Sequence, residues 1–273
     1  MSATCWQPSL RVSTAGGEGL SGGGGRSPGG RGPVPPVLPV LTLNHARLQL
    51  GGAWVLRDIQ LSIRPGERVA LVGANGSGKS TLLRLMHGLL LPTEGERLAQ
   101  PGCLQAMLFQ RPHVLRTSAL NNVALALWLR SGWWRWGAWR ASQALARQAL
   151  AQVGLLDQAH KPAKTLSGGQ QQRLALARCC SFGPDMLLLD EPTASLDPHA
   201  KRDVEALIAE LGQTKTLVFA SHNLGQVKRL ATRVLYLEQG RVLADLPVHE
   251  FFNGQVLPVR YPEAHLFVQG ETT

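Results

Sequence analysis

Apolar residues recur in two patterns along the chain, and together these patterns predict an α/β fold. Leu41 and Leu43 alternate with polar positions, as do the apolar residues of 59–63, and Gly51-Gly52 lies between the two runs. This period of two predicts an antiparallel β-ribbon. Short buried strands are predicted at residues 68–72, 104–109, 186–189, 216–220 and 234–237. Helical stretches separate most of these strands, which predicts a mainly parallel sheet covered by helices.

Three further segments define the domain organisation. Residues 119–153 have helical periodicity and no convincing strand, with a Gly- and Trp-rich break at 131–139, so we expect an inserted helical subdomain at about 111–165. Residues 1–36 contain ten Gly and five Pro, which predicts a flexible leader, or a start codon placed too far upstream. The folded domain is then predicted to cover residues 37–256, followed by a short tail at 257–273.

Composition fits a globular protein of one large domain or two small ones. The chain has 273 residues, 44% hydrophobic and 17% charged, with a net charge of +10. Residues 110–180 hold ten Lys and Arg against one acidic residue, Asp157, so the positive charge is local. The longest apolar run, 123–129, is too short to cross a bilayer. Four scattered cysteines predict reduced thiols, and no secretory signal begins the sequence.

A glycine-rich motif between a predicted strand and a predicted helix indicates phosphate binding. Residues 73–80, GANGSGKS, match G-x-x-x-x-G-K-[ST], and a helix is expected at 80–90. Backbone N–H groups of such a loop surround phosphate oxygens at a helix N-terminus. Lys79 would reach the β- and γ-phosphates, and the Ser80 hydroxyl would bind Mg²⁺. The predicted phosphate-binding residues are Gly73, Ala74, Asn75, Gly76, Ser77, Gly78, Lys79, Ser80 and Thr81.

A pair of carboxylates supplies the expected partner of this loop. The apolar strand at 186–189 ends in Asp190 and Glu191. Asp190 is predicted to hold Mg²⁺, and Glu191 to act as the general base that polarises the attacking water. The sequence therefore predicts a Mg²⁺-dependent P-loop NTPase.

A third motif carries a family resemblance. Residues 166–170, LSGGQ, resemble the signature of the ATP-binding subunits of ABC transporters, and the family's other motifs follow in its order. The resemblance implies an ATPase that uses ATP and Mg²⁺. It assigns Gln110 to Mg²⁺ and the attacking water, and His222 to the γ-phosphate. It implies a head-to-tail dimer in which the signature of one copy closes on ATP held by the other, with these residues at the shared site: Ser167, Gly168, Gly169, Gln170 and Asp197.

One position departs from the family pattern. The aromatic residue that usually stacks on adenine corresponds here to Leu50. Adenine must then lie on an aliphatic surface or on nearby Trp54. Weaker stacking, with looser selectivity between ATP and GTP, is the resulting hypothesis.

Non-catalytic residues suggest a transporter class. Residues 108–123 and the short C-terminal region are similar to importer subunits for oxyanions, most closely the tungstate type, with phosphate or amino-acid import as alternatives. The resemblance implies an integral membrane permease, an exported substrate-binding protein and a peripheral position on the cytoplasmic face of the inner or plasma membrane. A soluble ABC ATPase acting on nucleic acid or ribosomes is the alternative from a different class, although no nucleic acid is expected. The Trp-rich break indicates a membrane-near surface or a partly packed helix hairpin.

Overall fold

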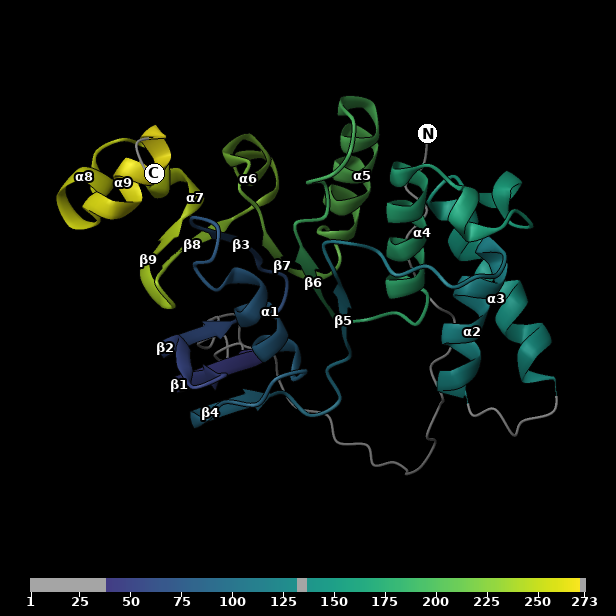
Figure 1. Cartoon of the computed structure of the whole chain (residues 1–273), viewed down its shortest axis with the longest axis horizontal. Helices are drawn as coiled ribbons and strands as arrows, with labels where there is room; N and C mark the ends of the chain where they lie inside the picture. The colour runs from purple at the N-terminus through teal and green to yellow at the C-terminus, as the bar shows by residue number, and fades with distance from the viewer. Residues whose placement is uncertain (1–37, 132–136, 271–273) are drawn as a thin grey trace, which may run out of the picture.

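A six-stranded sheet forms the centre of the computed structural model, which describes residues 38–131 and 137–270 (Figure 1). Its strand order is β5-β6-β7-β3-β8-β9, and every neighbouring pair is parallel except β8 and β9. The predicted α/β fold with a mainly parallel sheet is therefore confirmed. The strands are β3 (Arg68–Val72), β5 (Gln105–Leu108), β6 (Met186–Asp190), β7 (Thr216–Ala220), β8 (Arg233–Glu238) and β9 (Arg241–Pro247).

A separate three-stranded antiparallel sheet has the order β2-β1-β4. Leu41 pairs with Ile63 and Leu43 with Leu61, so the predicted ribbon is confirmed. Its strands are β1 (Leu41–Leu50), β2 (Ala53–Ile63) and β4 (Glu94–Ala99). The sequence reasoning did not predict β4 or β9.

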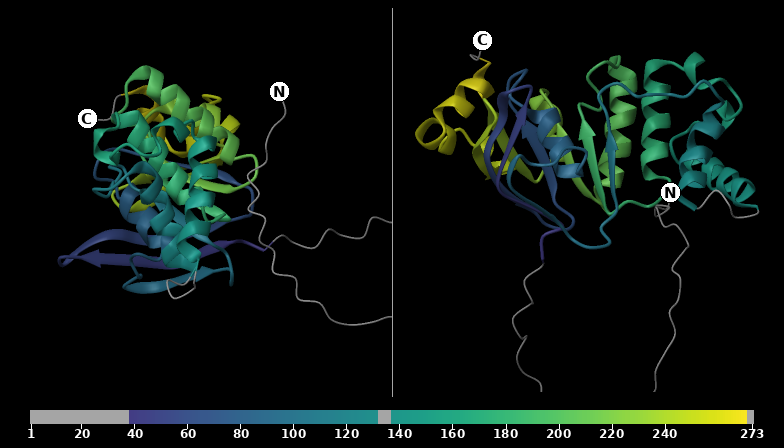
Figure 2. Two further views of the ribbon diagram at one scale, coloured as in Figure 1. Left: turned by 90° about the vertical axis from the view of Figure 1, so that its right-hand side faces the viewer. Right: turned by 60° about the horizontal axis from the view of Figure 1, so that its bottom comes forward.

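The two sheets enclose the helix α1 (Lys79–His87). Buried residues of α1, of β1 and β2, and of one face of the central sheet form a single hydrophobic cluster. Figure 2 shows the antiparallel sheet on the side of the central sheet that α1 covers. The opposite face of the central sheet packs against α4 (Gly168–Cys180), α5 (Pro198–Leu211) and α6 (Leu224–Leu230). Helices therefore cover both faces of the central sheet, as expected for a doubly wound α/β domain.

A helical hairpin stands beyond α4 at the end of the molecule (Figure 1). It consists of α2 (Ala119–Ser131) and α3 (Ala138–Gln152), followed by short 3₁₀ turns η1 (Leu156–Gln158) and η2 (Ala163–Thr165). This hairpin lies where the sequence predicts the helical subdomain. Leu174 and Ala177 of α4 belong to the hairpin's cluster, whereas other α4 residues belong to the central core. Trp128 and Trp139 meet edge to face at 5.9 Å, and the middle of the Trp-rich break lies outside the described residues, as does the leader at 1–36.

The C-terminal residues expected as a tail are helical and packed on the core. They include α7 (Val248–Phe251), α8 (Val256–Arg260) and α9 (Pro262–Gln269). Leu257 and Ala264 are buried, and the ring of Phe267 lies 5.4 Å from that of Tyr236 in β8. The predicted end of the folded domain at residue 256 thus falls at the first residue of α8. Across residues 38–131 and 137–270, we find no helix with both the length and the apolar character needed to cross a membrane.

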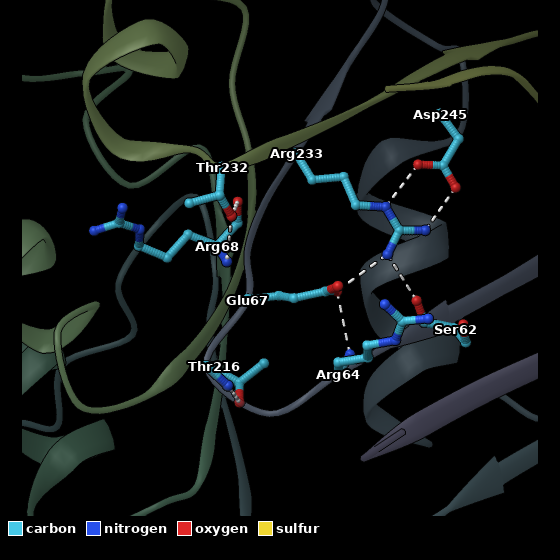
Figure 3. Close-up of polar contacts among 9 residues, drawn as sticks. Ser62, Arg64, Glu67, Arg68, Thr216, Thr232, Arg233 and Asp245 are labelled. Atoms are coloured by element: carbon cyan, nitrogen blue, oxygen red, sulfur yellow. Dashed lines mark hydrogen bonds and ion pairs between the residues drawn. The ribbon is translucent and has the colours of Figure 1, made fainter. Parts of the chain in front are cut away.

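An arginine connects the two sheets at the amino ends of β3 and β8 (Figure 3). Arg233 donates two hydrogen bonds of 2.6 Å to the carboxylate of Asp245 and one of 3.0 Å to Glu67. It also donates to the backbone oxygen of Ser62 in β2 at 2.9 Å. Its side chain is 22% exposed, so these charged contacts lie partly out of solvent. They fix the antiparallel sheet against the end of the central sheet that is remote from the glycine-rich loop.

Candidate functional site

The glycine-rich loop, residues 73–78, joins β3 to α1 at the carboxyl edge of the central sheet. Gly73 has φ +148°, and a Cβ there would collide with the carbonyl oxygen of Leu237. Gly78 is the N-cap of α1 with φ +106°, a conformation that only glycine adopts readily. Ala74, Asn75 and Gly76 are exposed at the crest of the loop, whereas the Ser77 hydroxyl oxygen is buried without a hydrogen-bond partner. The loop therefore presents backbone groups and one unpaired hydroxyl at a helix N-terminus.

Lys79, the first residue of α1, lies folded against this loop. Its Nζ donates to the backbone oxygens of Gly73 at 2.8 Å and Ala74 at 2.9 Å, and its side chain is buried. Burial lowers the pKa of Lys79, and the negative charges of Glu191 and Asp190 oppose this shift. The ammonium group is thus held at the mouth of the loop, within the field of both carboxylates. Thr81 follows in the first turn of α1 and is partly buried.

Ser80 and Asp190 meet across the site although they are far apart in the chain. The Ser80 hydroxyl donates to Asp190 Oδ1 at 2.8 Å. Asp190 ends β6 and is 2% exposed. Burial raises the pKa of Asp190, while the Ser80 hydrogen bond and the charge of Arg84 oppose the shift. A hydroxyl and a carboxylate side by side are the oxygen donors that Mg²⁺ prefers, so these residues fit the ion that the sequence predicts.

Glu191, Gln110 and His222 converge beside this pair. Gln110 Nε2 donates to Glu191 Oε2 at 3.0 Å, and His222 Nδ1 lies 3.5 Å from the same oxygen. The three residues follow β6, β5 and β7, which are adjacent and parallel, so their carboxyl ends open at one edge. Glu191 has φ +44°, and its N–H donates to the carbonyl of Ala220 at 3.2 Å. A carboxylate with an amide and an imidazole on one oxygen is suited to orient and deprotonate a water molecule.

The signature residues lie on the opposite face of the sheet from α1. Ser167 caps α4: its Oγ accepts from Gln170 N at 3.3 Å, and Gln170 Oε1 accepts from Ser167 N at 3.0 Å. Asp197 caps α5 by accepting from the N–H groups of His199 and Ala200, which lowers its pKa. Gly168 and Gly169 begin α4, and Gly169 packs directly on Ala200 of α5. Within the described chain, the signature and the glycine-rich loop are therefore not brought together.

Comparisons with known proteins decide the family. The family model described as "ABC transporter" matches residues 56–194. An aliphatic sulfonates import ATP-binding protein of Agrobacterium fabrum is 39% identical over 201 residues, covering 72% of this chain and 71% of the relative. A nickel import ATP-binding protein of Rhodobacter capsulatus is 39% identical over 238 residues, covering 78% of this chain and 91% of the relative. The chain belongs to the ABC transporter family.

The structure of an ATP-binding cassette dimer in a post-hydrolysis state, bound to ADP and Pi, is similar to this ABC ATPase. The TM-score is 0.67 at 28% sequence identity, and the match covers 76% of this chain and 98% of the other. Members of the family hydrolyse ATP with Mg²⁺, and the predicted enzyme class and cofactors are confirmed at this level. The roles of the individual residues remain predictions from geometry.

The two candidate supports for adenine in this ABC ATPase lie on opposite sides of the β1–β2 ribbon. Leu50 pairs with Ala53, and the next pair is Gln49 with Trp54, so the side chains of Leu50 and Trp54 point to different faces. Leu50 is 42% exposed and Trp54 37%. Trp54 also lines a cavity of about 360 Å³ with Arg47, Arg57, Asp58 and Arg241. Leu50 and Trp54 are therefore alternatives and cannot both contact one base.

Sequence reasoning missed a group of buried polar residues behind His222. Gln226 is 1% exposed, and its amide contacts both the Ser221 hydroxyl, at 2.7 Å, and the Thr193 hydroxyl, at 3.0 Å. A glutamine in an amphipathic helix gives no signal of burial, so only the fold could reveal this contact.

Proposed function

We propose that this chain is the ATP-hydrolysing subunit of an ABC importer. The observation that carries the proposal is the convergence of Gln110 and His222 on Glu191, beside the hydrogen-bonded pair Ser80 and Asp190. The segments that follow the adjacent strands β5, β6 and β7 supply Gln110, Glu191 and His222 respectively. A site made only to bind nucleotide would not need a carboxylate held by two oriented polar partners.

Each residue has a distinct task in the proposed hydrolysis. Backbone amides of residues 73–78 and the ammonium of Lys79 bind the phosphates. Ser80 and Asp190 would hold Mg²⁺, which would neutralise charge on the phosphate oxygens. Glu191 accepts a proton from the attacking water, while Gln110 and His222 keep its carboxylate oriented. Because Asp190 is buried and Glu191 is only partly so, the two acids are suited to metal binding and proton transfer respectively.

A second copy of the chain completes the site in this proposal. Ser167, Gly168, Gly169 and Gln170 lie on the α4 side of the sheet, away from their own glycine-rich loop. Two copies arranged head to tail would place each signature, with Asp197 nearby, over the ATP of the other. The similar cassette structure with ADP and Pi is described as a dimer, which supports this arrangement.

The remaining partners follow from an import function. Both relatives described above are named import ATP-binding proteins, which supports a permease partner and a peripheral position at the cytoplasmic membrane face. An exported binding protein would deliver the substrate to that permease. The basic stretch at 110–180, which includes the helical hairpin, suits contact with a permease or anionic headgroups.

An oxyanion is our proposed substrate class, with tungstate as the specific prediction. The sulfonate relative is named for an anion whose charge is carried by oxygen atoms on a tetrahedral sulfur, which supports the class, whereas the nickel relative is named for a cation. Phosphate and amino acids remain the alternatives. The transported ion does not contact this subunit, so the choice depends on partner proteins.

Three experiments test the proposal. Purified protein should release phosphate from ATP only with Mg²⁺, and Glu191→Gln should lower the rate at least a hundredfold while ATP still binds. Mixing Ser167→Ala with Glu191→Gln should restore part of the activity only if each site uses both copies. Unchanged phosphate release in Glu191→Gln would refute the assigned mechanism. Tungstate-stimulated ATPase activity of the chain reconstituted with its permease and binding protein would identify the ion. Stimulation by phosphate alone would refute tungstate but keep the oxyanion class, and stimulation by glutamine alone would refute the class.

A further inference from the structure

A buried hydrogen-bond chain links the loop that carries His222 to the segment that follows Glu191. The Ser221 hydroxyl donates to Gln226 Oε1 at 2.7 Å, and Gln226 Nε2 donates to the Thr193 hydroxyl at 3.0 Å. Thr193, Ser221 and Gln226 are all at most 5% exposed. Water therefore competes little for these bonds, and each loss would leave a buried polar group unpaired.

The same glutamine is fixed from its backbone side. Its N–H donates to Asn223 Oδ1 at 2.9 Å, because Asn223 is the N-cap of α6. The Asn223 N–H in turn donates to the Ser221 hydroxyl at 3.0 Å. His222 lies between these two residues, so its backbone is held on both sides. Its own side chain is 58% exposed and contacts Glu191.

The chain of contacts reaches the carboxylate from the other direction. Thr193 is two residues after Glu191, whose backbone N–H already bonds to Ala220 at the end of β7. A polar cavity of about 60 Å³ lies between the two segments and is lined by both Glu191 and His222 as well as Gln226. The two segments that supply the reacting groups are thus connected behind the site by a single amide side chain.

We propose that Gln226 is a positioning residue that keeps His222 in register with Glu191 during hydrolysis. It does not touch the reacting atoms and acts through Ser221 and Thr193. If the amide is removed, the loop after β7 loses its bond to the segment after β6, and the 3.5 Å contact between His222 and Glu191 loosens. A misplacement of about 1 Å in a catalytic group lowers the turnover rate far more than it weakens nucleotide binding. The inference rests on the roles proposed above for Glu191 and His222.

The main test uses Gln226→Met, which preserves the length of the side chain and removes both hydrogen bonds. We expect kcat for Mg²⁺-ATP to fall about tenfold, with KM within twofold of the parent, because the glycine-rich loop is untouched. Thr193→Val should give the same loss, and Thr193→Ser, which keeps the hydroxyl, should restore the rate. The double variant Gln226→Met with Thr193→Val should be no slower than the slower single variant, since both interrupt the same chain of hydrogen bonds.

Thr216→Val is the matched control. Thr216 is 3% exposed at the other end of β7, where its hydroxyl accepts from the Gly66 N–H at 3.0 Å. This variant loses one buried hydrogen bond on the same strand but far from Glu191, and should keep the parent kcat. If Gln226→Met does not fold, the pair Thr193→Val and Thr193→Ser carries the test.

Two results would overturn the inference. One is a kcat of Gln226→Met within twofold of the parent, and the other is a double variant whose losses multiply. Glu191→Gln, measured in parallel, separates the role of Gln226 from the function of the hydrolytic site. A large loss in Glu191→Gln with none in Gln226→Met removes only the role of Gln226, whereas no loss in Glu191→Gln removes the hydrolytic site itself.

Discussion

The contact between the signature helix and α5 provides a sharp test of packing. A Cβ at Gly169 would lie 2.5 Å from the Cβ of Ala200, whereas carbon atoms prefer separations of about 3.5–4.0 Å. Gly169→Ala therefore forces α4 and α5 apart by roughly 1 Å, at a cost of about 1–3 kcal/mol for overpacking. Alanine recovers up to about 1 kcal/mol of helix propensity relative to glycine. We expect a net destabilisation of about 1–2 kcal/mol.

Thermal and guanidinium unfolding without nucleotide would measure this effect. For a domain of this size, each kcal/mol corresponds to a fall in Tm of roughly 2–4 °C. Gly168→Ala is the matched control, because its Cβ would lie 4.0 Å from Leu196 Cδ2, an ordinary contact. That variant should be neutral or slightly stabilising.

A compensating substitution distinguishes the clash from other effects of the new methyl group. Ala200→Gly alone should cost about 1 kcal/mol in α5. Combined with Gly169→Ala it removes the clash, so the double variant should be at least about 1 kcal/mol more stable than the sum of the single effects predicts. Additive effects in this cycle would show that the two helices adjust freely, and would refute the argument.

Three other predictions follow from the described contacts. Arg233→Met should lower the free energy of unfolding by about 1–3 kcal/mol in guanidinium titrations, because it leaves the partly buried carboxylate of Glu67 and the more exposed one of Asp245 without a cation; an unchanged midpoint would contradict this. Asp190→Asn should abolish Mg²⁺-dependent hydrolysis yet raise Tm. The raised pKa of Asp190 means that its contribution to stability is present below the unfolded-state pKa and is lost as pH rises through the folded-state pKa, so the advantage of Asn should grow from pH 4 to 7. A difference in Tm that is independent of pH would contradict it. Of the two single variants Trp54→Ala and Leu50→Ala, only one should weaken ATP binding measured by calorimetry. Equal losses of affinity in the two variants would contradict the register of β1 and β2.

Strong local patterns made much of the central sheet predictable. Four consecutive apolar residues defined β3, and the predicted and observed bounds of β7 agree. By contrast, β4 has no buried residue on either face and pairs only with β1, so no alternation marks it. The helix α1 ends at His87 instead of Leu90, because Gly88 adopts φ +89° and its N–H bonds back to Arg84 and Leu85.

The candidate site shows the same division between local and long-range information. The glycine-rich loop is contiguous, and its motif covers every residue from Gly73 to Ser80. The contact of Gln110 with Glu191 joins residues 81 positions apart. The end of a buried strand pointed to Glu191, whereas only the family resemblance pointed to Gln110. The burial of Gln226 was not predicted, because burial of a polar side chain depends on how α6 packs against the segment after β6.

The position of α4 between two hydrophobic clusters has a consequence for how such proteins can diversify. The hairpin of α2 and α3 packs on one side of α4, while the other side of α4 belongs to the core that supports the strands. The hairpin can therefore be exchanged for another of similar length without redesigning the sheet, provided that Leu174 and Ala177 keep matching neighbours. A change on α4 itself alters both clusters together. If the hairpin contacts partner proteins, as proposed above, recognition of different partners can change in the hairpin while the hydrolytic machinery stays constant.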